Sequence, residues 1–203
     1  MSAPDSKAKT VGGSTRDRLI DAAFRVVARD GMEAASVKSI AAEAGIAPGL
    51  VHYHFANKDA VLEAALRRAL EDYRLRSRER RAAFAAGDQI GALMADARAA
   101  VSTDADVFRV RLAFATRALT NPQLASVVQA LNADAVEETA LTFAAAAGRD
   151  HATEAERATA AVIKAIFDGV MLARLNDPSF PLERAADFLE QSLRAALAQL
   201  QNH

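Results

Sequence analysis

The chain has 203 residues, of which 51% are hydrophobic and 25% are charged, and it contains no cysteine. This composition is that of an ordinary soluble globular protein. The lack of cysteine excludes disulfide frameworks, thiolate nucleophiles and Cys-ligated metal sites. The net charge is only −1, yet residues 1–80 carry 14 Lys/Arg and 11 Asp/Glu, whereas residues 81–203 carry 11 and 15. The mildly basic first part indicates an end of the molecule that faces a polyanion.

The sequence also lacks the signals of a membrane or exported protein. No apolar run approaches the roughly 18 residues of a membrane span. Residues 1–14 are polar, without the apolar core of a signal peptide, and are interpreted as a disordered lead-in. We therefore expect a cytoplasmic protein with no membrane partner. Alanine supplies 50 residues, and since it is the strongest helix former, the chain is expected to be nearly all helix.

Caps and glycines divide the first 81 residues into four predicted helices. Ser14 or Thr15 can cap the first, which ends at Gly31, and Gly45 ends the second. Pro48 suits the first position of a short third helix, because its missing N–H costs nothing there. The fourth helix ends in an Arg-rich run, 74–81, which we expect to be a solvated helix end. The predicted ranges are about 15–30, 37–44, 48–55 and 58–81.

The rest of the chain shows the same kinds of helix-starting and helix-ending residues. Asn121 is a cap followed by a first-turn proline, and Thr153 with Glu156 forms a capping box. No segment alternates apolar and polar residues with β-branched enrichment, so no strand is predicted. The sequence therefore predicts an all-α protein of nine helices, the last five spanning about 89–102, 105–119, 122–147, 154–176 and 181–200.

Residues 36–58 contain two short helices joined by a glycine-containing turn, which is typical of a helix-turn-helix unit. Ala41 is small where the two helices must approach closely, and Gly45 permits a turn with positive φ. Val51 and Phe55 fill the inner face of the second helix. The outer face is then free to enter a major groove of DNA, and it carries Gly49, Leu50, His52, Tyr53 and His54.

At these residues the chain resembles the tetracycline-repressor (TetR) family of transcriptional regulators. The family pattern is Ile-Ala-x-x-Ala-Gly-Val-Ser followed by Gly-x-Leu-Tyr-x-His-Phe-x-x-Lys-x-x-Leu. The matching residues here are Ile40-Ala41, Ala44-Gly45-Ile46-Ala47, Gly49, Val51, His52-Tyr53-His54-Phe55 and Asn57-Lys58. The match covers about residues 15–65. Asp168-Gly169 and the Asn-Asp-Pro helix ending also resemble a common C-terminal variety of the family.

The resemblance implies a homodimeric repressor of double-stranded operator DNA whose C-terminal helices bind a small effector. It implies a lead-in at 1–14, a DNA-binding domain at 15–60 and an effector-binding and dimerisation domain at 61–203. Lys58 is expected against a phosphate. The chain departs from the usual family residues at Pro48, Leu50 and His52. Base recognition is therefore expected to rest more on Lys38, Tyr53, His54 and apolar contact with thymine methyls. The expected DNA-contacting residues are Ser36, Lys38, Ser39, Ala47, Pro48, Gly49, Leu50, His52, Tyr53, His54 and Lys58.

The sequence offers little support for catalysis or metal binding. His52 and His54 are two residues apart, which on a helix directs them about 200° apart, so they cannot share one ion from one face. There is no Gly-rich phosphate loop, no His-Glu-x-x-His and no nucleophile motif. No histidine follows a glutamate by three residues, which excludes a carboxylate-bridged di-iron bundle. We expect neither enzymatic activity nor a cofactor.

The effector site is expected among apolar helices of the C-terminal part, with few polar points. Arg111 and Asp168 interrupt apolar stretches, and a buried charge must be paired or must meet a ligand. An internal Arg–Asp or Lys164–Asp168 pair is the alternative, as is a purely core role for each phenylalanine. We therefore expect a mainly hydrophobic effector, which carries a carboxylate if Arg111 is unpaired. The candidates are Phe84, Met94, Phe108, Arg111, Phe114, Phe143, Phe167, Asp168 and Met171.

Small and apolar residues on the last two helices predict a four-helix contact across a two-fold axis. The rival functions are a regulator gated by a partner protein, an activator, and a helical ligand-binding or enzymatic bundle with a vestigial helix-turn-helix. The sequence specifies no effector, operator or regulated gene. The expected dimer-interface residues are Ala165, Gly169, Leu172, Ala173, Leu189, Leu193, Ala196 and Leu200.

Overall fold

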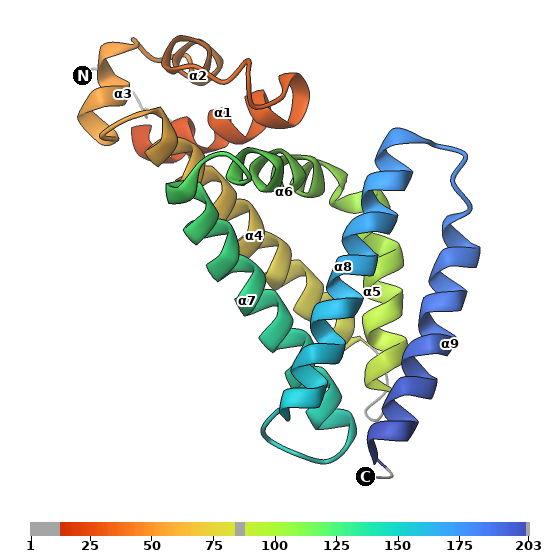
Figure 1. Ribbon diagram of the computed structural model, residues 1–203. Coiled ribbons are helices and arrows are strands. Elements are labelled where there is room, and N and C mark those ends of the chain that lie inside the picture. The colour runs from red at the N-terminus through yellow and green to blue at the C-terminus, as the bar shows by residue number, and fades with distance from the viewer. Residues whose placement is uncertain (1–12, 84–87, 202–203) are drawn as a thin grey trace, which may run out of the picture. The chain divides into compact units, whose positions relative to one another are not determined.

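The computed structural model describes residues 13–83 and 88–201. In this part of the chain it contains nine α-helices and no strand, which confirms the predicted all-α class (Figure 1). No helix among the described residues is both long and apolar enough to cross a membrane. The chain divides into two compact units, with the boundary between Ala65 and Leu66. The predicted boundary, between residues 60 and 61, lies five residues earlier in the same helix.

The capping residues act where the sequence places them. Ser14, Ser36 and Thr153 each accept a hydrogen bond from the backbone N–H three residues later and close a reciprocal capping box. Asn121 Oδ1 accepts from the backbone N–H of Leu124 at 3.1 Å. These bonds satisfy N–H groups that have no partner inside the helix. Helix starts were therefore predictable to within a residue or two.

The first unit packs α1 (Thr15–Asp30) against α2 (Val37–Ala44), followed by α3 (Gly49–His54) and the start of α4 (Lys58–Ala82). The third helix is shorter than the predicted 48–55, because Pro48 is its cap and Phe55 has an extended backbone with φ −139°. That extended residue turns the chain toward α4, and its side chain is buried. The other large buried side chains of this unit are Leu19, Ile20, Val26, Val27, Ile40, Val51, Val61 and Leu62.

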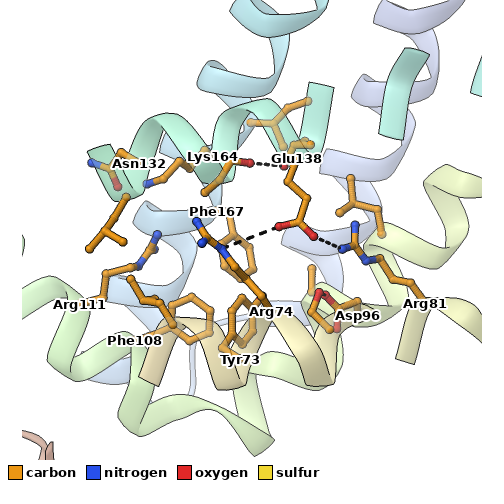
Figure 2. Close-up of a pocket in the computed structure, with 18 of the residues that line it drawn as sticks. Tyr73, Arg74, Arg81, Asp96, Phe108, Arg111, Asn132, Glu138, Lys164 and Phe167 are labelled. Atoms are coloured by element: carbon orange, nitrogen blue, oxygen red, sulfur yellow. Dashed lines mark hydrogen bonds and ion pairs between the residues drawn. The ribbon is translucent and has the colours of Figure 1, made fainter. Parts of the chain in front are cut away.

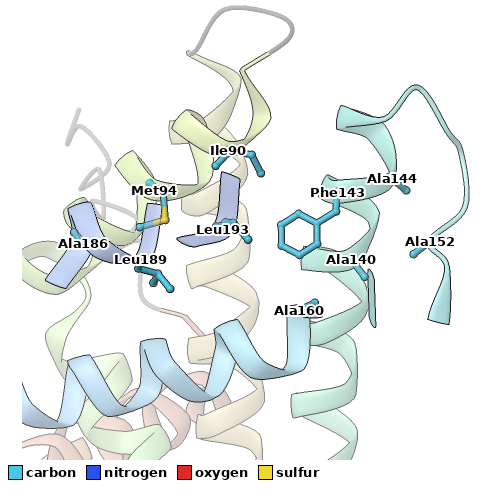
Figure 3. Close-up of a cluster of buried hydrophobic side chains, with 10 residues drawn as sticks. All are labelled: Ile90, Met94, Ala140, Phe143, Ala144, Ala152, Ala160, Ala186, Leu189 and Leu193. Carbon is cyan, nitrogen blue, oxygen red and sulfur yellow. The ribbon is translucent and has the colours of Figure 1, made fainter. Parts of the chain in front are cut away.

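The second unit contains the rest of α4 and five further helices. They are α5 (Gln89–Thr103), α6 (Ala105–Ala118), α7 (Pro122–Ala146), α8 (Glu154–Asn176) and α9 (Leu182–Gln201). Helix α7 packs on α6 and α8, and α5 packs on α9 and α7. One core cluster joins α5, α7, α8 and α9 around Phe143, Leu189 and Leu193 (Figure 3). A second cluster places Phe108 of α6 against Met171 of α8 and Ala100 of α5.

Candidate DNA-binding and effector sites

The turn between α2 and α3 has the geometry that the sequence predicts. Gly45 has φ +65°, a left-handed conformation that glycine adopts without steric cost. The Ile46 N–H donates to the carbonyl of Ala41 at 2.9 Å, and Ala41 is fully buried. Arg18 of α1 adds a contact that the sequence did not reveal, since its Nη2 donates to the carbonyl of Ala44 at 2.7 Å. The end of α2 is thus bonded to α1 as well as to the turn that follows it.

Helix α3 presents a sharply divided surface. Val51 is fully buried, whereas Tyr53 is 82% exposed and Leu50 is 47% exposed. His52 is also exposed, and His54 is half-buried with its ring edge-on to Tyr53 at 5.1 Å between centroids. An aromatic residue so exposed contributes little to the fold of this unit. The outward residues that the sequence predicts for DNA contact are therefore accessible, together with Ala47, Pro48 and Gly49.

The remaining candidates lie at helix starts. Ser36 and Ser39 form the capping box of α2, and the Ser39 hydroxyl also donates to the carbonyl of Ala34 at 2.8 Å. Lys38, between them, is exposed. Lys58 is half-buried and opens α4 beside Asn57, whose side chain accepts from the Ala60 N–H at 2.9 Å. Because N–H groups at a helix start attract a phosphate, both lysines lie where a backbone contact to DNA is favoured.

The second unit contains a partly open cavity of about 150 Å³ among α4–α8, with one residue from α9 (Figure 2). Its floor is aromatic: the rings of Tyr73 and Phe108, and those of Phe108 and Phe167, meet edge-to-face at 5.3 Å. Burial raises the pKa of the Tyr73 hydroxyl above its usual value. The aliphatic part of the wall consists of Leu66, Leu70, Leu93, Met94, Ala97, Val128, Leu131, Ala135, Ile163 and Leu189.

Charged side chains also line this cavity, contrary to the expectation of few polar points. Glu138 accepts from Arg81 at 2.9 Å, and Asp96 accepts from the Ser77 hydroxyl at 2.6 Å. Polar lining side chains come from five helices, α4 to α8: Tyr73, Arg74, Ser77, Arg81, Asp96, Arg111, Asn132, Glu138, Thr139 and Lys164. A ligand here would meet an apolar floor and a charged wall.

Arg111 and Asp168 form an ion pair, so the pairing alternative is correct. Lys164 also binds Asp168, with Nζ 2.7 Å from its carboxylate. Arg111 nevertheless lines the cavity, with its guanidinium 5.1 Å from the Phe108 ring centroid. Burial and the neighbouring Arg111 lower the pKa of Lys164, against the opposing effect of Asp168. The Arg111–Asp168 ion pair thus lies at the cavity wall.

Of the nine candidate effector residues, Met94, Phe108, Arg111 and Phe167 line the cavity. Asp168 lies beside it through its ion pairs. Phe84 falls outside the described residues. The other three candidates are buried and do not line the cavity. Phe143 and Met171 belong to the two core clusters, and the third is Phe114.

The interpretation of the Arg-rich end of α4 as a solvated helix end is only partly correct, since the side chains of Arg76 and Arg78 are 45% and 59% exposed but the other face is covered. The side chains of Arg74 and Arg81 are only 19% and 17% exposed, and Ser77 is buried. A signal was present in the sequence, since Leu66, Leu70, Tyr73, Arg74, Ser77 and Arg81 continue one helical stripe. The apolar residues that begin this stripe predict that its later, charged members face the same neighbours.

The predicted dimer surface is split between the core and the exterior. Leu189 and Leu193 lie in the core of the protomer at 6% and 2% exposed, and so offer almost no surface to a partner. Ala165, Gly169 and Leu172 are exposed. Ala173 and Ala196 are half-buried, and the side chain of Leu200 is not described. Larger exposed apolar side chains lie nearby on α8 and α9: Val162, Ile166 and Phe188.

A helix-turn-helix with an accessible second helix, joined to a helical unit that holds a cavity, defines the chain as a DNA-binding regulator with a ligand-binding domain. Comparison with known families agrees. Residues 19–65 match the model of bacterial regulatory proteins of the tetR family, and residues 91–198 match the C-terminal domain of BetI-type transcriptional repressors. The chain belongs to the TetR family of transcriptional regulators, and it is a regulator, not an enzyme.

Relatives of known function agree with this assignment. The nicotine-responsive transcriptional repressor HdnoR of Paenarthrobacter nicotinovorans is 32% identical over 82% of this chain and 86% of its own. The regulator BetI of Paraburkholderia xenovorans is 29% identical over 86% of this chain and 91% of its own. Both are named as transcriptional regulators.

Solved structures share the fold. A transcriptional regulator from Rhodococcus sp. Rha1 superposes with a TM-score of 0.76 at 27% identity, covering 92% of this chain and 97% of its own. The multidrug-binding protein EbrR in complex with imidazole gives 0.66 at 30% identity, covering 89% and 95%. A regulator from Saccharomonospora viridis in complex with choline gives 0.69 at 23% identity, covering 89% and 93%.

Proposed function

We propose that the protein is a homodimeric repressor that leaves a palindromic operator when a small molecule fills the cavity of the second unit. The observation that carries the DNA-binding part is the exposed face of α3, where Tyr53 projects opposite the buried Val51. Two such helices read successive major grooves when they lie about 34–36 Å apart. A ligand that favours another spacing shifts the population away from the DNA-bound form. Since such an operator is chromosomal, the protein would act in the cytoplasm.

An electrophoretic mobility shift with the DNA upstream of the protein's own gene tests this proposal. Tyr53→Ala should weaken binding sharply, because an exposed aromatic residue on α3 is suited to contact bases or sugars. Lys58→Ala should weaken binding to all sequences and lower the salt slope by about one phosphate contact. Leu119→Ala, at an 84% exposed side chain of the second unit, is the control. Unchanged operator binding by both first-unit variants would refute the assignment of α3 as the reading helix.

The dimer is proposed to form through the outer faces of α8 and α9. Its support is a set of apolar side chains that are exposed in the single chain: Phe188 at 73%, Val162 at 59%, Leu172 at 48% and Ile166 at 44%. Exposed apolar area of this kind marks a contact surface. Light scattering should give about 43 kDa, twice the 21.5 kDa of the chain. Phe188→Glu should give monomers, whereas Leu119→Glu should not.

Leu193→Glu is a poor test of the interface, because Leu193 is 2% exposed within the protomer and its loss would disrupt the fold directly. A stable wild-type monomer would contradict the symmetric-operator mechanism.

The cavity supports a small-molecule effector over gating by a partner protein. It lies within the second unit and has an aromatic floor that can hold an apolar part of a ligand. HdnoR is named as nicotine-responsive, and the S. viridis and EbrR structures are complexes with choline and imidazole. These names support a small organic effector here as well. Thermal-shift screening, followed by the mobility shift with each stabilising compound, identifies effectors that release DNA.

A further inference from the structure

The charges on the cavity wall are not balanced. Four cationic side chains line it: Arg74, Arg81, Arg111 and Lys164. The carboxylate of Asp96 has a cation of its own, because Arg80 Nε donates to it at 2.5 Å. Glu138 and Asp168 make the short contacts with the lining cations, and Asp134 and Glu71 lie farther from Arg74. Among the lining side chains themselves cations outnumber carboxylates, in a partly desolvated space where charges interact more strongly than in water.

Arg74 is the cation with the weakest carboxylate contacts. Its guanidinium lies 3.5 Å from Asp134 and 3.9 Å from both Glu71 and Glu138. A charge-assisted hydrogen bond spans about 2.7–2.9 Å, so these three contacts are long. Glu138 instead receives its short bonds from Arg81 at 2.9 Å and from Arg78 at 3.2 Å. Figure 2 shows the Arg74 guanidinium above the aromatic floor, between Glu138 and Arg111.

On the opposite side of the cavity, too, cations outnumber the carboxylates that they contact. Arg111 and Lys164 share the single carboxylate of Asp168. Burial and, second, the nearby charge of Arg111 lower the pKa of Lys164. Within the described residues, Nε of Arg111 and Nε of Arg81 are buried without a hydrogen-bond partner. Arg111 and Arg81 thus each keep an N–H donor that no group in the described part of the chain accepts.

The size of the space limits what can join these donors. A cavity of about 150 Å³ is the volume that accommodates one benzene molecule in a protein interior. Its floor of Tyr73, Phe108 and Phe167 suits the face or edge of one ring. We propose that the effector is a single-ring monocarboxylate, with its ring on this aromatic floor and its carboxylate beside Arg74. This assignment rests on the proposed ligand-gated function and specifies the chemical class of the ligand.

A quaternary ammonium such as choline, the ligand of the S. viridis structure, would add positive charge to this wall. Carboxylates on the wall of this chain are already engaged by Arg80, Arg81, Arg111 and Lys164. The chain therefore discriminates against cations through charge, although the aromatic floor alone would tolerate them.

The test is isothermal titration of the full-length wild-type protein with benzoate, phenylacetate and cyclohexanecarboxylate, compared with benzyl alcohol and choline. At least one carboxylate should bind at least tenfold more tightly than benzyl alcohol, and choline should bind weakest. Arg74→Gln should lower carboxylate affinity about tenfold or more, the size of one hydrogen bond to a charged group. Lys164→Met removes a second lining cation without removing that bond and should lower carboxylate affinity by a smaller factor. Arg98→Gln is the matched control, since Arg98 pairs with Asp187 at 2.7 Å outside the cavity.

The proposal is overturned if no carboxylate binds, if benzyl alcohol or choline binds as tightly, or if both cavity variants keep wild-type affinity. The mobility shift separates this failure from that of the proposed function. Release of DNA by choline or benzyl alcohol alone would refute the anion assignment and leave ligand gating intact. Tight carboxylate binding without any release of DNA would support the assignment and refute gating by this cavity.

Discussion

Glu138→Gln removes the carboxylate that holds three arginines and should destabilise the protein selectively at the cavity. The side chain of Glu138 is 27% exposed, and those of Arg81 and Arg74 are 17% and 19% exposed. Losing one partner of a fully buried pair costs about 3–5 kcal/mol, and exposed pairs contribute about 0–1. For these partly buried groups we expect about 2 kcal/mol. For a chain of this size that lowers Tm by about 4–8 °C.

The neighbouring residue provides a matched control. Glu137 is on the same helix and pairs with Arg157 at 2.6 Å, but both side chains are more than 40% exposed. Glu137→Gln should therefore leave thermal unfolding close to wild type. Circular dichroism melts of both variants measure the difference. Equal effects of the two substitutions, or a wild-type melt for Glu138→Gln, would refute the reasoning that the cavity cations depend on Glu138.

The same variant should also bind benzoate more tightly, because Arg74 and Arg81 lose a competing carboxylate. Saturating benzoate should then recover much of the lost stability, since a ligand at 100 times its dissociation constant adds about 2.7 kcal/mol. If benzoate stabilises Glu138→Gln less than it stabilises wild type, Glu138 does not compete with the ligand.

Three further substitutions have expected outcomes. Phe143→Ala should cost about 3–5 kcal/mol in denaturant unfolding and leave benzoate affinity of the folded protein unchanged, because Phe143 is a core residue off the cavity wall. Gly45→Ala forces an L residue to φ +65°, at about 1–2 kcal/mol, and should weaken operator binding in the mobility shift while sparing benzoate binding. Lys164→Met should raise Tm at neutral pH, because the folded protein holds the charged lysine at a cost that methionine does not have. The pKa of Lys164 in the folded protein is lowered from 10.5, so just below pH 10.5 the unfolded chain binds more protons than the folded one. The stability of the wild type therefore rises with pH in that range. A pH series of melts should show that rise in wild type and not in the variant.

The fold could be predicted almost entirely because its signals are local. Ser36, Thr153 and Asn121 begin helices through side chains that bond to N–H groups only three residues away. Gly45 ends α2 through its own backbone conformation. The helix-turn-helix is equally local, since the buried Val51 and the exposed Tyr53 are two residues apart. Such features need no knowledge of which distant segments meet.

The cavity and the dimer surface depend on distant contacts, and there the predictions were incomplete. Arg81 is shielded because α7 brings Glu138 to it, 57 residues along the chain. Leu193 has the same apolar character whether it meets α5 and α7 of its own chain or a second protomer. Periodicity predicts that such a residue is buried, but it does not tell whether a helix of the same chain or a second protomer buries it. The structure assigns Leu193 to the core and leaves Phe188, five residues earlier, exposed.

Arg111 shows why a paired charge and a ligand contact are not exclusive alternatives. The sequence suggested that Arg111 either pairs with Asp168 or meets a ligand, yet the structure shows the ion pair on the cavity wall. A cation left unpaired in the ligand-free state would bear the full cost of desolvation, whereas one held by Asp168 does not. The ion pair thus holds a cation on the cavity wall at a lower desolvation cost. Because Lys164 also binds Asp168, loss of either cation would leave that carboxylate paired with the other.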